Sequence, residues 1–246
     1  MRRFYLQPQN IHDNIAVFTS KEARHIHSAL RLQPGTNIEV FDGSGKLYQA
    51  VIKESSPKRV LTEIIYEIKK DDTGKPSLTL AVGLLKGKKM DLIVQKATEL
   101  GVHTLQPLTT RYCERKEQVG AQSERRLRIM LEACKQCGRV HPMHIAPTLN
   151  IMNFFPQPDA YKIMPYEQEK STAFPSTLPA ATRKACLLIG PEGGFHPTEV
   201  ELAENLGFQT VSLGPLILRA ETAVISSVAL TMHLLGAFTP TPDTAG

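Results

Sequence analysis

The sequence predicts an α/β protein in which a small β-rich region precedes a larger domain built on a parallel sheet. Two apolar runs, 185–189 and 210–213, each end in a loop that contains glycine. Runs of this length, bounded by Gly and Pro, are typical of strands buried on both faces of a parallel sheet. Ligands bind at the carboxyl ends of such strands, so the two glycine loops predict a cleft for a small molecule.

Residues 1–72 are predicted to form the β-rich region. The stretch Thr19-Ser20-Lys21-Glu22 matches a capping-box pattern and predicts a helix from this point through Leu32. Strands are expected at 37–41, 47–52 and 60–68, and the turn at 42–45 joins the first two as a hairpin. Short strands that close around one another predict a barrel.

Residues 73–240 are predicted to form the larger domain, after a polar linker at 71–77. His196-Pro197-Thr198-Glu199 reads as a helix start, with Pro at the first helical position. The segment 150–184 carries no recognisable chemistry, and the ending 239–246 is expected to be disordered. The other expected elements are strands at 78–85 and 161–165, helices at 90–100 and 123–137 that end at Gly101 and Gly138, and a helix at 220–235 that is apolar on nearly all sides and therefore buried in its own core or against another subunit.

Bulk composition narrows the class of protein only moderately. Hydrophobic residues make up 41% of the 246 and charged residues 22%, which is ordinary for a globular protein. The net charge of +5 favours an anionic partner, although weakly. No apolar run approaches the ~20 residues of a membrane span, and the first residues lack a signal-peptide core. The simplest expectation is a cytoplasmic protein with no membrane partner.

The four cysteines do not suggest a disulfide framework or a metal site. Cys134 and Cys137 form a Cys-x-x-Cys pair, but it falls within a predicted helix and no second pair follows at a zinc spacing. We therefore expect no bound metal.

The late glycine loop fails both common nucleotide-binding patterns. A phosphate-binding P-loop needs four residues between its glycines and then Lys-Ser/Thr, which the loop from Gly190 to Phe195 lacks. The dinucleotide fingerprint needs three spaced glycines after the first strand of a domain, and this loop comes late in the chain.

Four ordered blocks of the chain resemble the SPOUT class of S-adenosylmethionine-dependent RNA methyltransferases, and most closely the ribosomal RNA small subunit methyltransferase E family. The blocks are 86–102, 132–139, 189–195 and 213–223. The resemblance implies an N-terminal PUA-like RNA-binding β-barrel and a SPOUT α/β domain with a C-terminal trefoil knot. It also implies a homodimer, S-adenosylmethionine as cofactor, and 16S ribosomal RNA of the small subunit as partner, methylated at N3 of a uridine.

The resemblance places the cofactor between the two glycine loops. Backbone groups and aliphatic side chains there would hold the methionine part and enclose the adenine. The residues implied are Leu188, Gly190, Pro191, Gly193, Gly194, Leu213, Leu216, Leu218, Glu221 and Thr222. Members of the family commonly carry a basic residue at the position of Leu216, so a side-chain contact to RNA there would be lost.

The reaction itself requires two protein functions. N3 of uridine carries a proton that must be accepted, and the negative charge developing on the base must be stabilised. Arg219 is the candidate for stabilisation, with a structural ion pair to Glu221 as its alternative role, and Arg139 would hold the target phosphate. The proton acceptor is left open between Glu99, Glu192 and water. Glu99 lies in the last turn of a helix, where the dipole disfavours an anion, which suggests either a role or simple exposure.

Cations near the N-terminus and in the basic segment 111–139 are candidates for RNA contact, because Lys and Arg neutralise phosphates with little base discrimination. A solvated helix face is the alternative for those on the first helix. The candidates are Arg2, Arg3, Arg24 and Arg31 near the N-terminus, Lys88 just after the strand expected at 78–85, and the uncharged Gln136, which the resemblance implies. Two other functions stay open: methylation of transfer RNA or a ribose 2′-hydroxyl, and RNA binding without catalysis.

Overall fold

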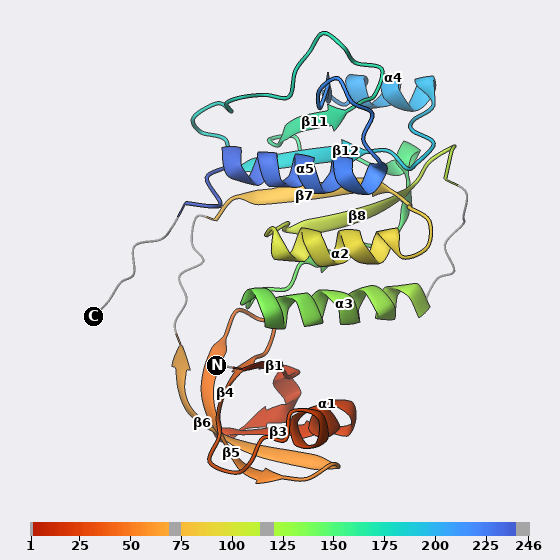
Figure 1. Cartoon of the computed structure of the whole chain (residues 1–246). Helices are drawn as coiled ribbons and strands as arrows, with labels where there is room; N and C mark the ends of the chain where they lie inside the picture. Colours follow the sequence, from red (N-terminus) through yellow and green to blue (C-terminus); the bar gives the residue numbers. More distant parts are fainter. Residues whose placement is uncertain (1, 69–74, 114–120, 240–246) are drawn as a thin grey trace. The chain divides into compact units, whose positions relative to one another are not determined.

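The computed structural model describes residues 2–68, 75–113 and 121–239 (Figure 1). The chain divides into two compact units. The first is Met1–Thr73 with Cys134–Pro142, and the second is Gly74–Ala133 with Met143–Gly246. The predicted boundary between residues 72 and 73, most of the predicted linker and the predicted disordered tail lie outside the described residues.

The first unit is built on one six-stranded sheet in the order β1-β4-β5-β6-β3-β2. Only the β1–β4 pair is parallel. β1 and β2 form the two edges, so the described strands make a half-barrel, and the predicted closure is confirmed only to that extent. Irregular register between β5 and β6 accompanies its curvature. The elements are β1 (Arg3–Tyr5), η1 (Pro8–Asn10), β2 (Ile11–His12), β3 (Ile15–Thr19), α1 (Ser20–Arg24), η2 (His25–Ala29), β4 (Asn37–Phe41), β5 (Leu47–Ser55) and β6 (Arg59–Ile68).

The predicted helix begins where expected, at Ser20 with Thr19 as its N-cap residue, but its capping box and its length are wrong. Thr19 makes no capping hydrogen bond, and Ser20 has a φ of 53°, outside the right-handed helical region. After Arg24 the helix widens into a π-helical turn that ends at Ala29. Phe18 and Ile26 are fully buried in the core of this unit, and that burial fixes the segment against the sheet.

The second unit contains a sheet of parallel strands in the order β10-β8-β7-β12-β11-β13, with β9 paired to β8. Its strands are β7 (Ser77–Gly83), β8 (Thr104–Thr109), β9 (His144–Ile145), β10 (Leu149–Asn150), β11 (Tyr161–Pro165), β12 (Lys184–Ile189) and β13 (Gln209–Val211). Its helices are α2 (Lys89–Glu99), α3 (Ala121–Cys137, whose last turn belongs to the first unit), η3 (Ile151–Asn153), α4 (Pro197–Asn205) and α5 (Ala220–Leu234).

The two apolar runs that predicted this sheet have different positions in it. β12 lies at the centre between β7 and β11, and its residues from Ala185 to Ile189 are buried as expected. The run 210–213 was expected to be buried on both faces, which is wrong for its strand. Among the described strands, β13 pairs only with β11 and lies at the edge of the sheet, so Val211 is its one fully buried residue.

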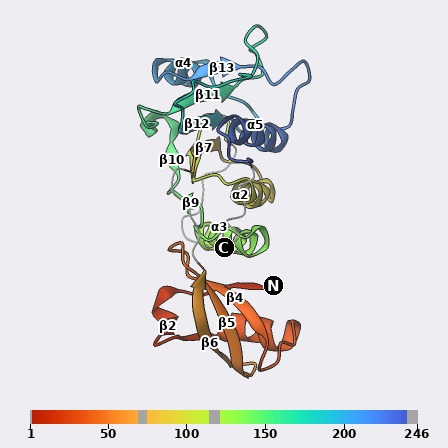
Figure 2. The same ribbon diagram turned by 90° about the vertical axis from the view of Figure 1, so that its left-hand side faces the viewer.

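Helices cover both faces of this sheet (Figure 2), with α2 and α5 on one face and α4 on the other. α5 packs on β7, β12 and α2, and its buried face carries Val224, Val228 and Met232. Leu230 of the same helix remains 43% exposed, so packing within this unit covers only part of the apolar surface of α5. Among the described residues, no helix is long and apolar enough to span a membrane.

Because its paired strands are parallel, their carboxyl ends meet along one edge of the sheet. The segments that leave this edge begin at Leu84 after β7, Thr110 after β8, Tyr166 after β11, Gly190 after β12 and Ser212 after β13. This edge carries both predicted glycine loops.

Candidate functional site

A cavity of about 1510 Å³ opens at the carboxyl edge of the second unit's sheet. Its walls come from the segments that follow β11, β12 and β13, from the first turn of α5, and from Lys89 of α2. Three segments far apart in the sequence therefore meet because their strands are neighbours in the sheet.

The loop after β12 forms one wall with residues from Gly190 to Gly194. The amide of Gly194 donates to the carbonyl oxygen of Pro191 at 2.9 Å, and Gly194 has a φ of 71°, which L side chains rarely adopt. A Cβ on Gly193 would lie 2.9 Å from Cβ of Tyr112. The turn is therefore closed by a backbone hydrogen bond and requires glycine for conformation at one position and for space at the next.

The helix after this loop begins as predicted. The Glu199 carboxylate accepts a hydrogen bond from the His196 amide at 2.9 Å, and the His196 ring accepts one from the Thr198 amide at 3.3 Å. Pro197 occupies the first position of α4. Glu199 also accepts a hydrogen bond at 2.7 Å from the amide of Arg111, in the segment after β8. This buried carboxylate therefore holds two edge loops together.

The segment after β13 forms the second wall. The amide of Gly214 donates to Oγ of Ser212 at 3.2 Å, and Gly214 has a φ of 112°. Ile217 of this segment is 89% exposed. Arg219, also exposed, is the N-cap residue of α5 and makes no side-chain capping bond. Arg219 thus lines the cavity together with residues of both glycine loops.

The segment after β11, Tyr166 to Ser171, forms a third wall, which the sequence did not predict. Glu169 organises it: one carboxylate oxygen accepts from the Ser171 amide at 2.7 Å, the Ser171 hydroxyl at 2.6 Å and the Thr172 amide at 2.9 Å. The other oxygen accepts from the Thr210 hydroxyl on β13 at 3.2 Å. The Ser171 hydroxyl, followed by these other donors, lowers the pKa of Glu169 to about 2. Glu169 therefore stays ionised and ties the wall to the edge strand.

Lys89 joins two carboxylates beside the cavity. Its Nζ lies 3.1 Å from Glu192 and 3.3 Å from Glu221, and the Lys86 amide donates to Glu192 at 3.2 Å. The hydrogen bond to Glu192 raises the pKa of Lys89, with Glu221 acting in the same direction against desolvation. Burial raises the pKa of Glu192, but hydrogen bonds from the backbone and from Lys89 outweigh it and leave that pKa below its usual range. The group is therefore one cation between two anions.

Most of the predicted cofactor residues lie together in the cavity lining. Those that line it are Gly190, Pro191, Gly193, Gly194, Leu213, Leu216 and Leu218, together with the predicted catalytic Arg219. The other three lie outside the lining: Leu188 is buried within β12, Glu221 pairs with Lys89, and Thr222 is exposed on α5. Glu221 thus has its ion pair with Lys89 and not with Arg219, the structural alternative raised for Arg219.

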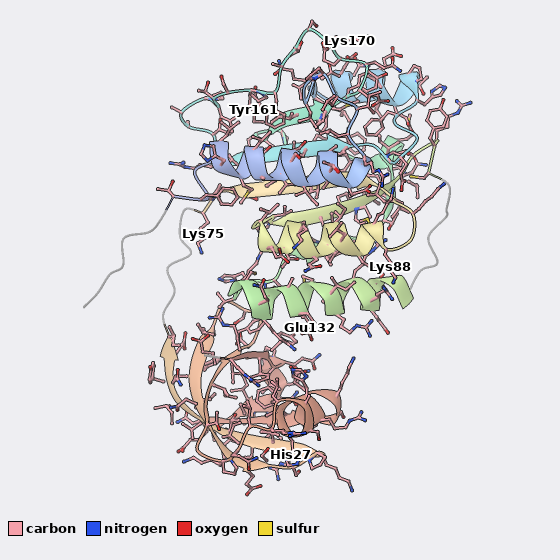
Figure 3. All side chains as sticks on the ribbon, in the orientation of Figure 1. His27, Lys75, Lys88, Glu132, Tyr161 and Lys170 are labelled. Atoms are coloured by element: carbon pink, nitrogen blue, oxygen red, sulfur yellow. The ribbon has the colours of Figure 1, made fainter. Side chains whose placement is uncertain are left out.

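The other predicted catalytic and basic residues have different surroundings. Glu99 ends α2 and accepts hydrogen bonds from Lys96 at 2.8 Å and Gln95 at 2.9 Å, outside the cavity lining. Lys88, labelled in Figure 3, precedes the first residue of α2, whereas its neighbour Lys89 lines the cavity. Both Arg139, which donates to the His141 carbonyl, and the exposed Gln136 belong to the first unit.

The N-terminal candidates divide into exposed and buried cations. Arg2, Arg24 and Arg31 are exposed. Arg3 is only 13% exposed, and its Nε donates to Glu39 at 2.8 Å across the parallel β1–β4 pair. This contact gives Arg3 a structural role in the sheet. RNA contact by any of the four stays a prediction.

The cysteine pair gives no sign of a metal centre. Cys134 is buried within α3, Cys137 is exposed, and Sγ of Cys137 contacts the carbonyl of Cys134. Burial raises the pKa of Cys134 to about 12. Across the part of the chain that the structure describes, no three His, Cys, Asp or Glu side chains are grouped as metal ligands.

Comparison with known proteins identifies the family. A model of the RNA methyltransferase domain matches residues 73–232, and a model of the RNA methyltransferase PUA domain matches residues 18–65. The Ribosomal RNA small subunit methyltransferase E of Aquifex aeolicus is 30% identical over 241 residues, which cover 95% of this chain and 100% of that protein. The chain belongs to the ribosomal RNA small subunit methyltransferase E family.

Solved structures of similar proteins share the whole fold. The Ribosomal RNA small subunit methyltransferase E of Neisseria gonorrhoeae, bound to S-adenosyl methionine, is 29% identical, with a TM-score of 0.83 over 95% of this chain and 98% of that one. A protein from Legionella pneumophila, solved in complex with the same cofactor, is 27% identical, with a TM-score of 0.80 over 96% of each chain. The family therefore includes proteins of this fold that bind S-adenosyl methionine.

Proposed function

We propose that this chain transfers the methyl group of S-adenosylmethionine to N3 of a uridine in the 16S ribosomal RNA of the small subunit, in the cytoplasm. The observation that carries the proposal is the three-walled cavity at the glycine loops. It occurs in a chain that matches, nearly end to end, the fold of a family member with S-adenosyl methionine bound. The cavity thus fits S-adenosylmethionine as the methyl donor, and the name of the family indicates small-subunit ribosomal RNA as the methyl acceptor.

The cavity has room for more than the cofactor. Small-molecule sites typically enclose about 300–1,000 Å³, and this cavity measures about 1510 Å³. Gly190, Gly193 and Gly194 let the backbone approach the donor closely, while Leu213 and Leu218 offer aliphatic surface to the adenine. The remaining volume suits a uracil ring brought against the methyl group.

The chemistry requires alignment and charge control. The sulfonium methyl is already activated, so the protein has to bring N3 in line with it, and alignment alone lowers barriers substantially. The bond from N3 to the methyl carbon forms as the bond from sulfur to that carbon breaks. S-adenosylhomocysteine leaves, and the N3 proton passes to a base.

Arg219 is the residue to which we assign charge stabilisation. It lines the cavity, and its carboxylate alternative, Glu221, is taken by Lys89. A guanidinium placed beside uracil donates to the oxygens on which the negative charge develops. Arg139 keeps its proposed role in holding a phosphate of the target strand.

The proton acceptor is better placed at Glu192 than at Glu99. Glu192 lines the cavity and is ionised beside Lys89, whereas Glu99 is paired with Lys96 outside the lining. Water entering the open cavity is the third acceptor. Glu192→Gln and Glu99→Gln separate the two residues: only the substitution at the true acceptor lowers kcat near neutral pH, and that loss shrinks as rising pH removes the N3 proton without help from the protein.

RNA docking is assigned to the first unit. Arg2, Arg24 and Arg31 are exposed cations on one small sheet-and-helix unit that matches the RNA methyltransferase PUA model. Such contacts are released by salt, so each lost phosphate contact reduces the slope of log affinity against log salt by about one.

Two features of the family's architecture form part of the proposal. The chain goes from edge strand β13 through the second wall to α5, which packs on central strands β12 and β7; this return path supports a trefoil knot. The exposed Leu230 on the apolar α5 supports a homodimer through that helix. Light scattering coupled to gel filtration tests the dimer, which a monomer mass at micromolar concentration would contradict.

The function is tested by methyl transfer from labelled S-adenosylmethionine. The protein is incubated with assembled small subunits, naked 16S ribosomal RNA or transfer RNA, and the labelled nucleoside is mapped by mass spectrometry. Label at N3 of a uridine in small-subunit RNA is the expected result. Label on transfer RNA or on a ribose hydroxyl would contradict it, and no label on any RNA would favour RNA binding without catalysis.

Arg219→Ala tests the site. We expect turnover to fall about 100- to 1,000-fold, as for other groups that stabilise transition-state charge, with cofactor affinity and folding preserved. Arg183→Ala is the matched control, since Arg183 is an exposed arginine just before β12, at the opposite edge of the sheet. Near-normal turnover of Arg219→Ala would remove Arg219 from the mechanism.

A further inference from the structure

The segment after β8 presents an aromatic side chain directly against the glycine loop of the cavity. Tyr112 is 45% exposed, and a Cβ on Gly193 would lie 2.9 Å from its Cβ and 3.4 Å from its carbonyl oxygen. Gly193 itself lines the cavity. Tyr112 therefore borders the cavity with one residue of backbone between.

A second ring accompanies Tyr112. Its ring centroid lies 5.9 Å from that of His196, and the two planes are inclined by 59°. Such a tilted pair is attractive and leaves part of the tyrosine face open. The two rings come from different loops, one after β8 and one after β12.

Both loops are fixed by one carboxylate. Glu199, only 5% exposed, accepts from the Arg111 amide at 2.7 Å and from the His196 amide at 2.9 Å. Cys113 adds a contact within the turn, its Sγ lying 3.4 Å from the Thr110 amide. The exposed ring is therefore held in position before any ligand arrives, which reduces the entropy lost on binding.

The charge beside the ring matches a nucleic acid. Arg111 is exposed, and within the described residues its guanidinium has no hydrogen bond or ion pair. An open aromatic face with a neighbouring guanidinium is the combination with which proteins bind single-stranded nucleic acid: bases stack on the ring and the cation takes the phosphate.

We propose that Tyr112 is a stacking platform for an unpaired nucleotide next to the target uridine, with Arg111 at its phosphate. The inference rests on the proposed RNA methylation, and adds how the substrate is held. A flanking base stacked on Tyr112 anchors the strand at the rim of the cavity, so that the next base can enter toward the cofactor. Tyr112 and Arg111 are thus positioning residues, which act on binding more than on the chemical step.

The test measures RNA affinity separately from cofactor affinity and turnover. A fluorescein-labelled single-stranded decaribonucleotide with one central uridine is titrated with the full chain saturated with S-adenosylhomocysteine, and anisotropy is followed. Tyr112→Ala is expected to weaken binding about 10-fold, the usual effect of losing one stacked base. Tyr112→Phe keeps the ring and is expected to bind within about twofold of wild type, while Tyr112→Leu, apolar but without a π-face, follows alanine.

Coupling to a base makes the test specific. The same oligonucleotide is made with an abasic site on each side of the uridine in turn, and a double-mutant cycle is built with Tyr112→Ala. We expect one abasic position to lower wild-type affinity about 10-fold and to have almost no further effect on Tyr112→Ala. Phe155→Ala is the control, since Phe155 is an exposed aromatic residue after η3 in the same unit.

Turnover distinguishes this inference from the proposed function. With RNA substrate, Tyr112→Ala is expected to raise KM about 10-fold while kcat and cofactor affinity change little. Additive effects of the tyrosine and abasic changes, or equal affinity of Tyr112→Ala and wild type, would overturn the platform even if the chain methylates RNA. Loss of cofactor affinity in Tyr112→Ala but not in Tyr112→Leu would instead give the residue a structural role on the glycine loop and also overturn it. Because binding is measured without methyl transfer, absence of turnover in wild type would refute the proposed function alone.

Discussion

Replacing Gly83 with alanine should lower both the stability of the chain and its affinity for the cofactor, because the new Cβ displaces the glycine loop. Gly83 ends β7, and an added Cβ would lie 2.6 Å from Cδ and 2.7 Å from N of Pro191, and 3.2 Å from C of Gly190. Ordinary contact begins at 3.4 Å, so strand and loop must separate by about 0.8 Å. The obstructing atoms belong to backbone and a proline ring, which cannot rotate away.

The cost follows from this displacement. Overpacking of this kind destabilises by about 1–3 kcal/mol, and each kcal/mol lowers the melting temperature of a chain of this size by about 2–4 °C. Because the displaced residues begin the glycine loop, cofactor affinity should fall as well. We expect a weakening of at least about 10-fold by isothermal titration calorimetry, equivalent to about 1.4 kcal/mol.

Two further Gly→Ala variants test whether the effect follows the severity of the contact made by the added Cβ. In Gly190→Ala the new Cβ meets the Phe195 ring at 3.2 Å and the Gly194 backbone at 3.3 Å, a milder contact, so its melting temperature should fall less than that of Gly83→Ala. In Gly35→Ala no atom lies within 4 Å, while the φ of 90° is strained, so this control reports backbone strain alone and should bind cofactor normally. Gly83→Ala with cofactor affinity and melting temperature equal to wild type would refute the packing argument.

Glu169→Gln should loosen the third wall, because an amide accepts the three donors at Ser171 and Thr172 less strongly than a carboxylate, and faster hydrogen exchange at those amides would reveal it. In the wild type the pKa of Glu169 is lowered to about 2. The stabilisation by its hydrogen bonds is therefore fully present above the ordinary carboxyl pKa and is lost as pH falls toward 2. A cofactor affinity that already declines between pH 8 and 5 would argue against this role of Glu169. Burial raises the thiol pKa of Cys134 and Cys186 to about 12, so iodoacetamide at pH 8 should label the exposed Cys137 in the folded chain and leave those two unmodified, as read by peptide mass spectrometry. Rapid labelling of Cys186 without denaturant would show that central strand β12 is less well packed than described.

The sequence was most informative where glycine and proline mark the ends of buried strands. Gly190 and Pro191 follow β12, and Gly214 and Pro215 follow β13. These two pairs mark both glycine walls in the sequence alone. Helix starts with a strong local signal were also correct, as at Pro197. At Thr19 the start was also correct, but the capping hydrogen bond does not form, and burial of Phe18 and Ile26 holds the segment instead.

The third wall could not be read from local patterns. Tyr166 to Ser171 looks like any polar loop, and its role arises because β11 lies between β12 and β13 in the sheet. The apolar run 161–165 predicts a strand, and ligand loops follow parallel strands, so the polar residues after this run are the one sequence signal for the third wall. Strand β8 was missed because Gln106 and Pro107 interrupt its apolar run.

Single-residue errors at the site have a geometric cause. Successive residues on a helix differ by about 100° in direction, so Lys89 reaches the cavity while its neighbour Lys88 does not. Leu188 illustrates the same point on a strand, since it is buried within β12 while the next residue, Ile189, lines the cavity. Sequence patterns locate segments well, but side-chain direction depends on where each element starts.

Because β13 lies at the edge of the sheet, one wall of the cavity is expected to have a higher local stability than the other. The glycine wall follows β12, which has a strand on each flank, whereas the wall that carries Arg219 follows the three residues of β13, whose one strand partner among the described residues is β11. Backbone amides next to β13 should therefore exchange with solvent well before those of β12, and a bound donor should slow the former most. A molecule that fills the cavity therefore stabilises the outermost strand. The rate of product release then depends on how easily that strand and the segment after it separate from the sheet.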